Sequence, residues 1–397
     1  MQSELNIGTV GHVDHGKTSV VENLTGVWTD THSMEIKRGI TIKLGYADAV
    51  IRRCPQCPLP QAYTTEEKCR YCGSQTNYVR KISFVDAPGH ETLMATVIAS
   101  AAIIDGALLV IAANEPCPQP QTKEHLMVLE TLGIKNVVIV QNKIDLVTPE
   151  KAKENYAQIK TFLAGTPYED APIIPLSANY GANTDLLIEA IENHIKTPKR
   201  DENVDPLMYI ARSFDVNKPG TDPHSLLGGV IGGSLIRGKL KVGDEIEVLP
   251  GIATEKGMIP IRTTIEGLSA GKERLEEVKP GGLIGVATGL DPSLTKADGL
   301  VGNVVGYVGR LPPLHDTLAI EYELLERVDF ENQQLKQGEI FVISVGTATT
   351  LGVVEKIKKG IAHFKLKRVI CAEKGARVAL SRRVGQRWRL CGAGKIV

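Results

Sequence analysis

The 397-residue sequence is poor in aromatic residues and in cysteine, and its formal net charge is zero. Aromatic residues make up 5% of the chain, and it contains seven cysteines. This composition excludes collagen-like, disordered and disulfide-scaffold proteins. The apolar fraction of 42% is sufficient for ordinary globular cores, and the length predicts two or three domains.

The sequence also lacks the segments that would direct it into or across a membrane. Its first residues, MQSELNIGTV, contain no cationic start followed by a long apolar run, so they are not a signal peptide. The longest apolar stretch, residues 97–113, is interrupted by Asp105 and is too short to span a bilayer comfortably. We therefore expect a soluble, cytoplasmic protein without a membrane partner.

The charge is unevenly distributed along the chain. Residues 361–397 contain ten Lys and Arg residues and one acid, Glu373. A basic end on a neutral chain indicates a polyanionic partner. A solvated strand face that happens to be basic explains the pattern equally well, so charge alone does not decide between the two.

The first motif with a specific chemistry is GHVDHGKT, residues 11–18. It stands between a short predicted strand, residues 6–10, and a helical pattern, which is the context that a P-loop requires. Backbone N–H groups and the helix N-terminus bind phosphates in such a loop. We expect Lys17 to reach the β- and γ-phosphates and the Thr18 hydroxyl to bind magnesium. The predicted phosphate-binding residues are Asp14, His15, Gly16, Lys17, Thr18 and Ser19.

A second motif, Asp-x-x-Gly, ends the predicted strand at residues 78–87. The carboxylate of Asp86 is expected to hold magnesium through water, and the N–H of Gly89 to meet the γ-phosphate. Between the two motifs stands RGIT, residues 38–41, where Thr41 can supply a second hydroxyl to magnesium and its N–H to the γ-phosphate. Both contacts of Thr41 need that phosphate, so GTP would order this loop and GDP would release it. A surface turn is the plain alternative.

Two later motifs indicate which base is bound. NKID follows a buried strand, and the carboxylate of Asp145 can accept both the N1–H and the 2-amino group of guanine, a pair that adenine does not offer. IIPLSAN, residues 173–179, is a further predicted strand, and its loop at Ser177 and Ala178 would close over the base. Each motif is weak alone, but four of them at the carboxyl ends of successive strands are strong evidence for a nucleotide site. The predicted base contacts are Asn142, Lys143, Asp145, Ser177, Ala178 and Asn179.

Four of the seven cysteines form two Cys-x-x-Cys pairs, separated by eleven residues. Such pairs suit tetrahedral zinc, although iron could occupy the same sulfurs, and two pairs without metal are the plain alternative. They fall in a loop between predicted strands at residues 44–53 and 78–87. A loop of this length in a compact domain is unusual unless a cross-link or a metal ion holds it in place. We predict a structural site, while Cys117, Cys371 and Cys391 are expected to be buried apolar residues. The four ligands would be Cys54, Cys57, Cys69 and Cys72.

The second half of the chain has a different pattern. After a charged, proline-bounded segment at residues 195–206, long helices give way to short strands with regular turns, which favour β-barrels. A second break falls near residues 310–317. We predict an α/β P-loop GTPase domain at residues 1–200, with helices on both faces of a mostly parallel sheet and an insertion at residues 54–72. Two β-barrel domains follow, at residues 201–316 and 317–397.

The motifs GHVDHGKT, RGIT, DAPGH, NKID and SAN resemble those of the translation-factor GTPases, the family of elongation factor Tu, and the resemblance in architecture covers essentially the full chain. It implies that His90, directly after Gly89, orients the attacking water. It also implies a second magnesium ion near Asp14 and the carbonyl of Gly39.

Within this family the cysteine pairs and the segments 32–47, 83–126 and 212–221 resemble the gamma subunits of archaeal and eukaryotic translation initiation factor 2. The short N-terminus favours an archaeal member. The resemblance implies a GTP-dependent switch that carries methionyl initiator tRNA to the small ribosomal subunit and releases it on GTP hydrolysis. It further implies an alpha subunit on the second domain and a beta subunit on the GTPase domain.

Two other functions share the GTPase motifs. An elongation factor for a special aminoacyl-tRNA, such as selenocysteine, should carry a further C-terminal domain, and the sequence ends at Val397. The cysteine pairs speak against the GTPase partner of sulfate adenylyltransferase. The basic third domain could face RNA, although structural ion pairing is an equally good interpretation. The candidate phosphate contacts there are Arg382, Arg383, Arg387 and Arg389.

Overall fold

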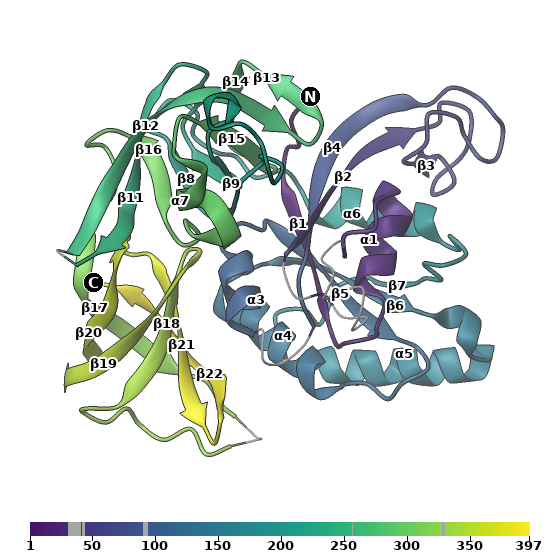
Figure 1. The fold of residues 1–397 in the computed structure, drawn as a ribbon. Coiled ribbons are helices and arrows are strands. Elements are labelled where there is room, and N and C mark those ends of the chain that lie inside the picture. Colours follow the sequence, from purple (N-terminus) through teal and green to yellow (C-terminus); the bar gives the residue numbers. More distant parts are fainter. Residues whose placement is uncertain (31–40, 42–43, 90–93, 256, 328–329) are drawn as a thin grey trace. The chain divides into compact units, whose positions relative to one another are not determined.

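The computed structural model describes residues 1–30, 41, 44–89, 94–255, 257–327 and 330–397 (Figure 1). They form two compact units. One unit is Ser3–Pro198, and the other combines Met1–Gln2 with Lys199–Val397. None of the helices in the described ranges has the length and apolar character needed to cross a bilayer.

The first unit is built on a seven-stranded sheet with the order β3-β2-β4-β1-β5-β6-β7. The strands from β4 to β7 are parallel, and β2 and β3 are antiparallel additions at one edge. The central strands β5 and β6 are buried along nearly their whole length, because helices cover both faces of the sheet. The strands are β1 (Asn6–Gly11), β2 (Gly45–Arg53), β3 (Tyr63–Thr64), β4 (Asn77–Asp86), β5 (Gly106–Ala112), β6 (Asn136–Asn142) and β7 (Ile173–Pro175).

Helices α1 and α6 pack through one apolar cluster against one face of this sheet, whereas α3, α4 and α5 lie on the other face (Figure 1). Because β1, β4 and β6 are parallel, their carboxyl ends and the loops that follow them meet at one edge. The helical elements are α1 (Lys17–Thr25), α3 (Met94–Ala101), α4 (Pro120–Thr131), η2 (Ile144–Leu146), α5 (Pro149–Leu163) and α6 (Thr184–His194). The predicted α/β class is confirmed.

The insertion between β2 and β4 contains more backbone pairing than the predicted coil. Strand β3 pairs with the end of β2, with Arg52 opposite Thr64. Lys68 and Gln75 form a further antiparallel bridge. The insertion has a small core of its own, made by Cys54, Ala62 and Cys69 with Cys57 packed against it.

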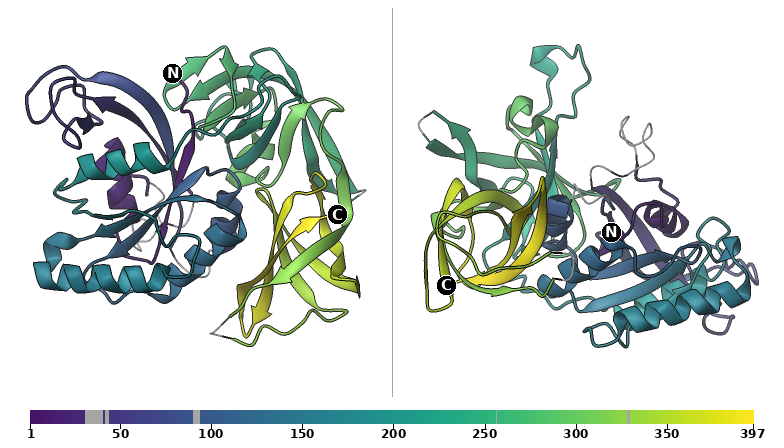
Figure 2. Two further views of the ribbon diagram at one scale, coloured as in Figure 1. Left: turned by 180° about the vertical axis from the view of Figure 1, so that it is seen from behind. Right: turned by 90° about the horizontal axis from the view of Figure 1, so that it is seen from below.

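The second unit contains two β-barrels (Figures 1 and 2). In the first barrel, six strands close in the order β11-β16-β8-β9-β15-β12, and β13 extends the sheet beyond β12. It also contains β10, β14 and short helical turns. Its elements are β8 (Leu207–Phe214), η3 (Pro223–Ser225), β9 (Val230–Arg237), β10 (Leu240–Lys241), β11 (Glu245–Thr254), β12 (Gly257–Ala270), β13 (Glu273–Leu275), β14 (Glu277–Val278), β15 (Ile284–Thr288), α7 (Pro292–Thr295), η4 (Lys296–Asp298) and β16 (Val304–Tyr307).

The second barrel is closed in the order β17-β20-β19-β18-β21-β22. The predicted domain boundary at residues 316–317 falls inside β17, so this barrel begins slightly earlier, at Leu314. Its strands are β17 (Leu314–Leu324), β18 (Ile340–Val345), β19 (Ala348–Lys358), β20 (Ile361–Cys371), β21 (Arg377–Val384) and β22 (Arg387–Ile396).

The two barrels contact each other directly. Leu207, Leu249 and Val304 of the first pack with Cys371 of the second in one apolar cluster. Beside it Arg237 forms an ion pair with Glu373 at 2.6 Å. Burial of Cys371 raises the pKa of its thiol to about 12.

The three cysteines outside the pairs differ in exposure. Cys371 and Cys391 are buried, as predicted, whereas Cys117 is partly exposed at the surface of the first unit. The prediction of a buried apolar role is therefore only partly right for Cys117.

Candidate nucleotide-binding site

The predicted phosphate loop connects β1 to α1, and its backbone has the unusual conformations that such a loop needs. Gly16 lies at φ 85° and Asp14 at φ 61°, both in the left-handed region. A Cβ on Gly16 would approach Nδ2 of Asn142 to 2.4 Å, so glycine is required there. The predicted Ser19 follows in α1.

Lys17, the first residue of α1, has a buried ammonium group held against the loop. Its Nζ donates to the carbonyl oxygen of His12 at 2.8 Å. Burial lowers the pKa of Lys17 to about 8, although Asp86 and Asp14 act in the opposite direction. A buried cation at the start of a helix, beside a turn with left-handed backbone at Asp14 and Gly16, suits a polyphosphate.

Three threonine hydroxyls surround the carboxylate of Asp86, which is fully buried. Thr18 and Thr29 donate to its Oδ2 at 2.7 and 2.8 Å, and Thr9 donates to Oδ1 at 2.7 Å. The hydroxyl oxygens of Thr18 and Thr41 lie 3.3 Å apart. Carboxylate and hydroxyl oxygens are the ligands that magnesium prefers, so the residues present fit this ion.

The structure thus brings together three predicted magnesium ligands, Thr18, Thr41 and Asp86. Gly39 and the predicted catalytic residue His90 lie outside the described residues. Gly89 is described, and a Cβ there would lie 2.4 Å from Nζ of Lys17. Its backbone is therefore close to the lysine that is expected to bind the γ-phosphate.

Asn142 joins the three loops of the site. Its Nδ2 donates to the carbonyl oxygen of His15 at 3.0 Å, and its Oδ1 accepts the N–H of Ala178 at 3.1 Å. Asp145 accepts a hydrogen bond from Ser177 Oγ at 2.5 Å through Oδ1. The carboxylate is therefore oriented by the loop that is predicted to cover the base. Asn179 is exposed, and Lys143 lies at φ 62°.

Sequence reasoning missed three buried residues of this region. Thr9 and Thr29 are two, through their bonds to Asp86. The third is His125 of α4, whose Nδ1 accepts the N–H of Gly11 at 2.6 Å. Burial lowers the pKa of His125 to about 3. None of the three stands in a recognisable motif, so only the folded chain reveals their role.

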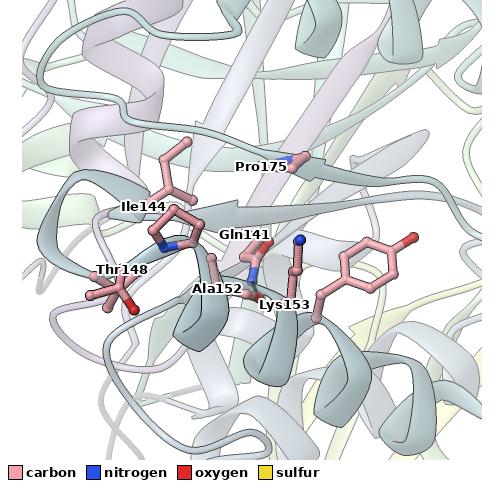
Figure 3. Close-up of a pocket in the computed structure, with 9 residues that line it drawn as sticks. Gln141, Ile144, Thr148, Ala152, Lys153 and Pro175 are labelled. Atoms are coloured by element: carbon pink, nitrogen blue, oxygen red, sulfur yellow. Dashed lines mark hydrogen bonds between the residues drawn. The ribbon is translucent and has the colours of Figure 1, made fainter.

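An apolar cavity of about 310 Å³ lies beside the NKID loop, between β6, β7 and α5 (Figure 3). Gln141 and Pro175 border it from the strands, Ile144 from the loop, and Ala152 and Lys153 from the helix. Its walls are largely apolar, so it does not suit a nucleotide. The polar groups described above form a separate site.

The four paired cysteines converge, as predicted. Their sulfur atoms all lie within 4.8 Å of one another. Cys54 and Cys72 sulfurs are 3.4 Å apart, and those of Cys57 and Cys69 are 3.6 Å apart. Zinc–sulfur bonds of about 2.3 Å in a tetrahedron place sulfurs roughly 3.8 Å apart, so the thiol groups fit zinc.

The structure corrects the prediction that Arg382 contacts RNA. Arg382 is buried, and its guanidinium forms an ion pair with Glu339 at 2.7 Å. It also donates to Asn332 Oδ1 at 2.9 Å and lies over the ring of Phe341 at 5.2 Å. Alternation along β21 points this side chain inward. By contrast, Arg383 and Arg387 are exposed and Arg389 is half-buried.

Comparison with family models divides the chain in three. Residues 2–197 match the elongation factor Tu GTP binding domain, and residues 228–306 match elongation factor Tu domain 2. Residues 316–396 match the model described as initiation factor eIF2 gamma, C terminal.

Two solved structures share the fold, each at 24% identity over 100% of this chain. One is a bacterial selenocysteine-specific elongation factor with a TM-score of 0.77, of which this chain spans 58%. The other is translation elongation factor SelB from Methanococcus maripaludis with a GTP analogue, with a TM-score of 0.74 and 79% of that chain covered.

Curated relatives are much closer in sequence. Translation initiation factor 2 subunit gamma of Methanothermobacter thermautotrophicus is 60% identical over 100% of this chain and 99% of its own length. The subunit gamma of Pyrococcus horikoshii is 58% identical over 100% of this chain and 98% of its own. The chain therefore belongs to the family of translation initiation factor 2 gamma subunits, which are translation GTPases.

Proposed function

We propose that the chain binds methionyl initiator tRNA in its GTP-bound form, delivers it to the small ribosomal subunit, and releases it when GTP is hydrolysed. The observation that carries this proposal is the 60% identity to a translation initiation factor 2 subunit gamma over the whole chain. The hydroxyls of Thr18 and Thr41 lie 3.3 Å apart beside Asp86. This arrangement supports a switch in which the position of Thr41 depends on the bound nucleotide.

In this proposal the phosphates lie on the loop of residues 14–19. The N–H groups of the loop donate to phosphate oxygens, and the Lys17 ammonium neutralises part of their charge. Thr18, Thr41 and Asp86 would hold the magnesium ion, with a second ion at Asp14 and the carbonyl of Gly39. A magnesium ion held by these residues would offset the negative charge that develops on the phosphate oxygens during hydrolysis.

The base would be read by Asp145. Its carboxylate accepts the N1–H and the 2-amino group of guanine, while Ser177 holds its Oδ1 at 2.5 Å. Asn142 fixes the phosphate loop and the covering loop at once, through His15 and Ala178. Lys143 and Asn179 complete the proposed set of base contacts.

The reaction step needs a water molecule in line with the γ-phosphate. We assign its orientation to His90, next to Gly89, in the place where Ras-like enzymes use Gln. Thr41 links this chemistry to binding, because its contacts depend on the γ-phosphate. Once that phosphate leaves, Thr41 and the preceding loop are released and the affinity for tRNA falls.

The proposed partners are an alpha subunit on the first barrel, a beta subunit on the GTPase domain, the initiator tRNA and the small ribosomal subunit. Zinc in the four-cysteine site closes the insertion as a structural element. On the second barrel, Arg383, Arg387 and Arg389 remain proposed phosphate contacts, whereas Arg382 is used inside the barrel. We place the domains at residues 1–200, 201–313 and 314–397.

The experiment that tests this function measures protection of the ester bond in methionyl initiator tRNA against spontaneous hydrolysis. The protein is assayed with a non-hydrolysable GTP analogue or with GDP, with initiator or elongator tRNA, and with the alpha subunit added. We expect protection that needs both the GTP analogue and the methionylated initiator.

A protein that binds GTP tightly but protects no aminoacyl-tRNA under any of these conditions would overturn the carrier function. Equal protection of elongator tRNAs would instead indicate an elongation factor. In both cases the GTPase assignment stands, because it rests on the family and not on the cargo.

A further inference from the structure

The cysteine-bearing insertion reaches the loop that is proposed to cover the guanine base. Arg70 and Tyr71 stand between the last two cysteines of the cluster. Tyr71 Oη donates to Oδ2 of Asp185 at 2.8 Å, and Arg70 Nη1 donates to the carbonyl oxygen of Gly181 at 3.4 Å. The sequence separations are 114 and 111 residues, so these contacts exist only in the folded domain.

Of the two contacted residues, Gly181 lies inside a tight backbone loop and Asp185 follows directly after it, in the first turn of α6. Ser177 and Ala182 exchange backbone hydrogen bonds of 3.3 and 3.2 Å. Gly181 has φ 64° and Asn183 has φ 65°, which are left-handed conformations held by the surrounding contacts. The same loop contains Ala178 and Ser177, which bind Asn142 and Asp145. A shift of Gly181 or Asp185 would therefore move the groups that orient the base-reading carboxylate.

The contact with Asp185 joins the insertion to the beginning of α6. The Asp185 carboxylate is buried in the first turn of α6. The neighbouring Thr184 donates to Asn23 of α1 at 2.8 Å, which connects the same helix end to the helix that follows the phosphate loop.

A polar cavity of about 130 Å³ lies between the insertion and α6, with Arg70, Thr64 and Glu66 on one side and Asp185 and Asn23 on the other. Beside this cavity, Tyr63 of β3 packs against the apolar cluster that includes Leu187 and Ile188 of α6. Arg70 and Tyr71 add the polar contacts of the insertion to this region, and they are flanked directly by Cys69 and Cys72.

We propose that Arg70 and Tyr71 are positioning residues of the guanine site, and that occupation of the four-cysteine cluster by zinc is thereby coupled to how long the protein retains guanine nucleotide. Zinc fixes the turn that carries both side chains, and the side chains hold the base-covering loop in its closed conformation. Such coupling is reciprocal, so bound nucleotide also strengthens retention of the metal. The inference rests on the proposed role of residues 177–179.

The first test substitutes Tyr71→Phe in the full chain, which deletes the hydroxyl alone. We expect dissociation of a fluorescent GDP analogue to become about three- to tenfold faster, which corresponds to roughly 0.6–1.4 kcal/mol. Zinc content and the thermal midpoint should change little. The matched control is Tyr78→Phe, an exposed tyrosine on β4, for which the rate should stay at the wild-type value.

The second test removes the metal with a chelator and measures metal content and GDP dissociation together. In the wild-type protein we expect an acceleration similar to that of Tyr71→Phe. In a Tyr71→Phe, Arg70→Ala double variant, chelation should add little, because the connection is already broken. The rate of amide hydrogen exchange at residues 177–183 should rise both in the chelated wild-type protein and in the double variant.

The outcomes separate the possibilities. Unchanged GDP dissociation in Tyr71→Phe and Arg70→Ala would overturn the positioning role, provided that Asp145→Asn still alters base preference. If Asp145→Asn also leaves base preference unchanged, the proposed base site itself is wrong. If chelation accelerates dissociation equally in wild type and in the double variant, the metal acts by another route and the coupling is refuted.

Discussion

The backbone N–H of Gly11 donates to Nδ1 of His125 at 2.6 Å and thereby joins the start of the phosphate loop to helix α4. His125 is fully buried. Its ring must be neutral to accept this bond, and burial lowers the pKa of His125 to about 3, well below its ordinary value of 6.5. A neutral, buried histidine therefore holds the start of the phosphate loop through its backbone, and this histidine plays no part in phosphate binding.

Replacing His125 by Phe should leave the Gly11 N–H without an acceptor and cost about 1–3 kcal/mol of stability. The pH dependence of the free energy of unfolding should change as well. In the wild type, the unfolded chain takes up a proton below pH 6.5 that the folded chain refuses until about pH 3. Stability therefore falls as the pH decreases through this window, by up to about 1.4 kcal/mol per pH unit for one histidine.

Urea unfolding of the variant between about pH 4.5 and pH 7.5 should show a pH dependence of stability that is shallower by about one proton than in the wild type. The control is His194→Phe, because His194 is exposed at the end of α6. An unchanged slope in the His125 variant would mean that this residue is not the one whose protonation destabilises the fold.

Replacing Asp145 by Asn should exchange guanine for xanthine specificity. The carboxylate accepts two N–H groups of guanine, whereas an amide offers one acceptor and one donor, which match the N1–H and 2-oxo group of xanthine. We expect GTP affinity to fall by about five- to 150-fold, since a buried unpaired donor costs roughly 1–3 kcal/mol. Displacement of a bound fluorescent nucleotide by GTP or by XTP measures this change in base specificity. Retention of full GTP preference would place the base elsewhere.

The motifs of this site could be predicted because each is local in sequence and stands at the end of a parallel strand. Asn142 and Asp145 belong to one tetrapeptide, and the fold only has to bring their loop to the shared edge. Thr29 and His125 could not be found in this way. Their partners are 57 and 114 residues distant, and an isolated Thr or His has many other uses.

Arg382 shows a different failure, since the sequence does contain a signal. Val378 and Leu380 of β21 belong to the core of the barrel, and Arg382 has the same parity along the strand. Alternation alone therefore predicts an inward Arg382 and an outward Arg383. The prediction of an exposed Arg382 relied on the charge of the side chain and not on this alternation. A buried arginine is nevertheless stable when a carboxylate and carbonyl oxygens pair with it.

The neighbouring arginines of β21 provide a matched pair of variants. Arg382→Ala should lower stability by about 3 kcal/mol, because it removes the buried guanidinium that pairs with the partly buried Glu339. Arg383→Ala should change stability by less than about 0.5 kcal/mol, since the side chain is exposed. Denaturant unfolding measures both. Equal effects of the two substitutions would contradict the inward orientation of Arg382.

The same pair also tests the proposed RNA surface. Binding of RNA to Arg383→Ala should weaken at low salt and show a smaller salt dependence, because a phosphate contact has been lost. If RNA binding and its salt dependence match those of the wild type, Arg383 is only a solvated surface residue.

Thr29 should tune the magnesium site without binding the ion. Its hydroxyl donates to the same Oδ2 of Asp86 as that of Thr18, at 2.8 and 2.7 Å, so it fixes the direction of the carboxylate. Thr29→Val keeps the shape of the side chain and removes the donor. We expect a several-fold higher magnesium concentration to be needed for slow GDP dissociation, because an outer hydrogen bond to a ligating carboxylate is typically worth tenfold or more in metal affinity.

Thr25→Val is the control for this variant, since the Thr25 hydroxyl bonds to the backbone of its own helix and the next turn. It should leave the magnesium dependence unchanged. An unchanged magnesium dependence in Thr29→Val would show that Thr18 and Thr9 orient Asp86 sufficiently without it. A variant that loses nucleotide at saturating magnesium would instead place Thr29 in the nucleotide contacts, because excess ion compensates only for weakened metal binding.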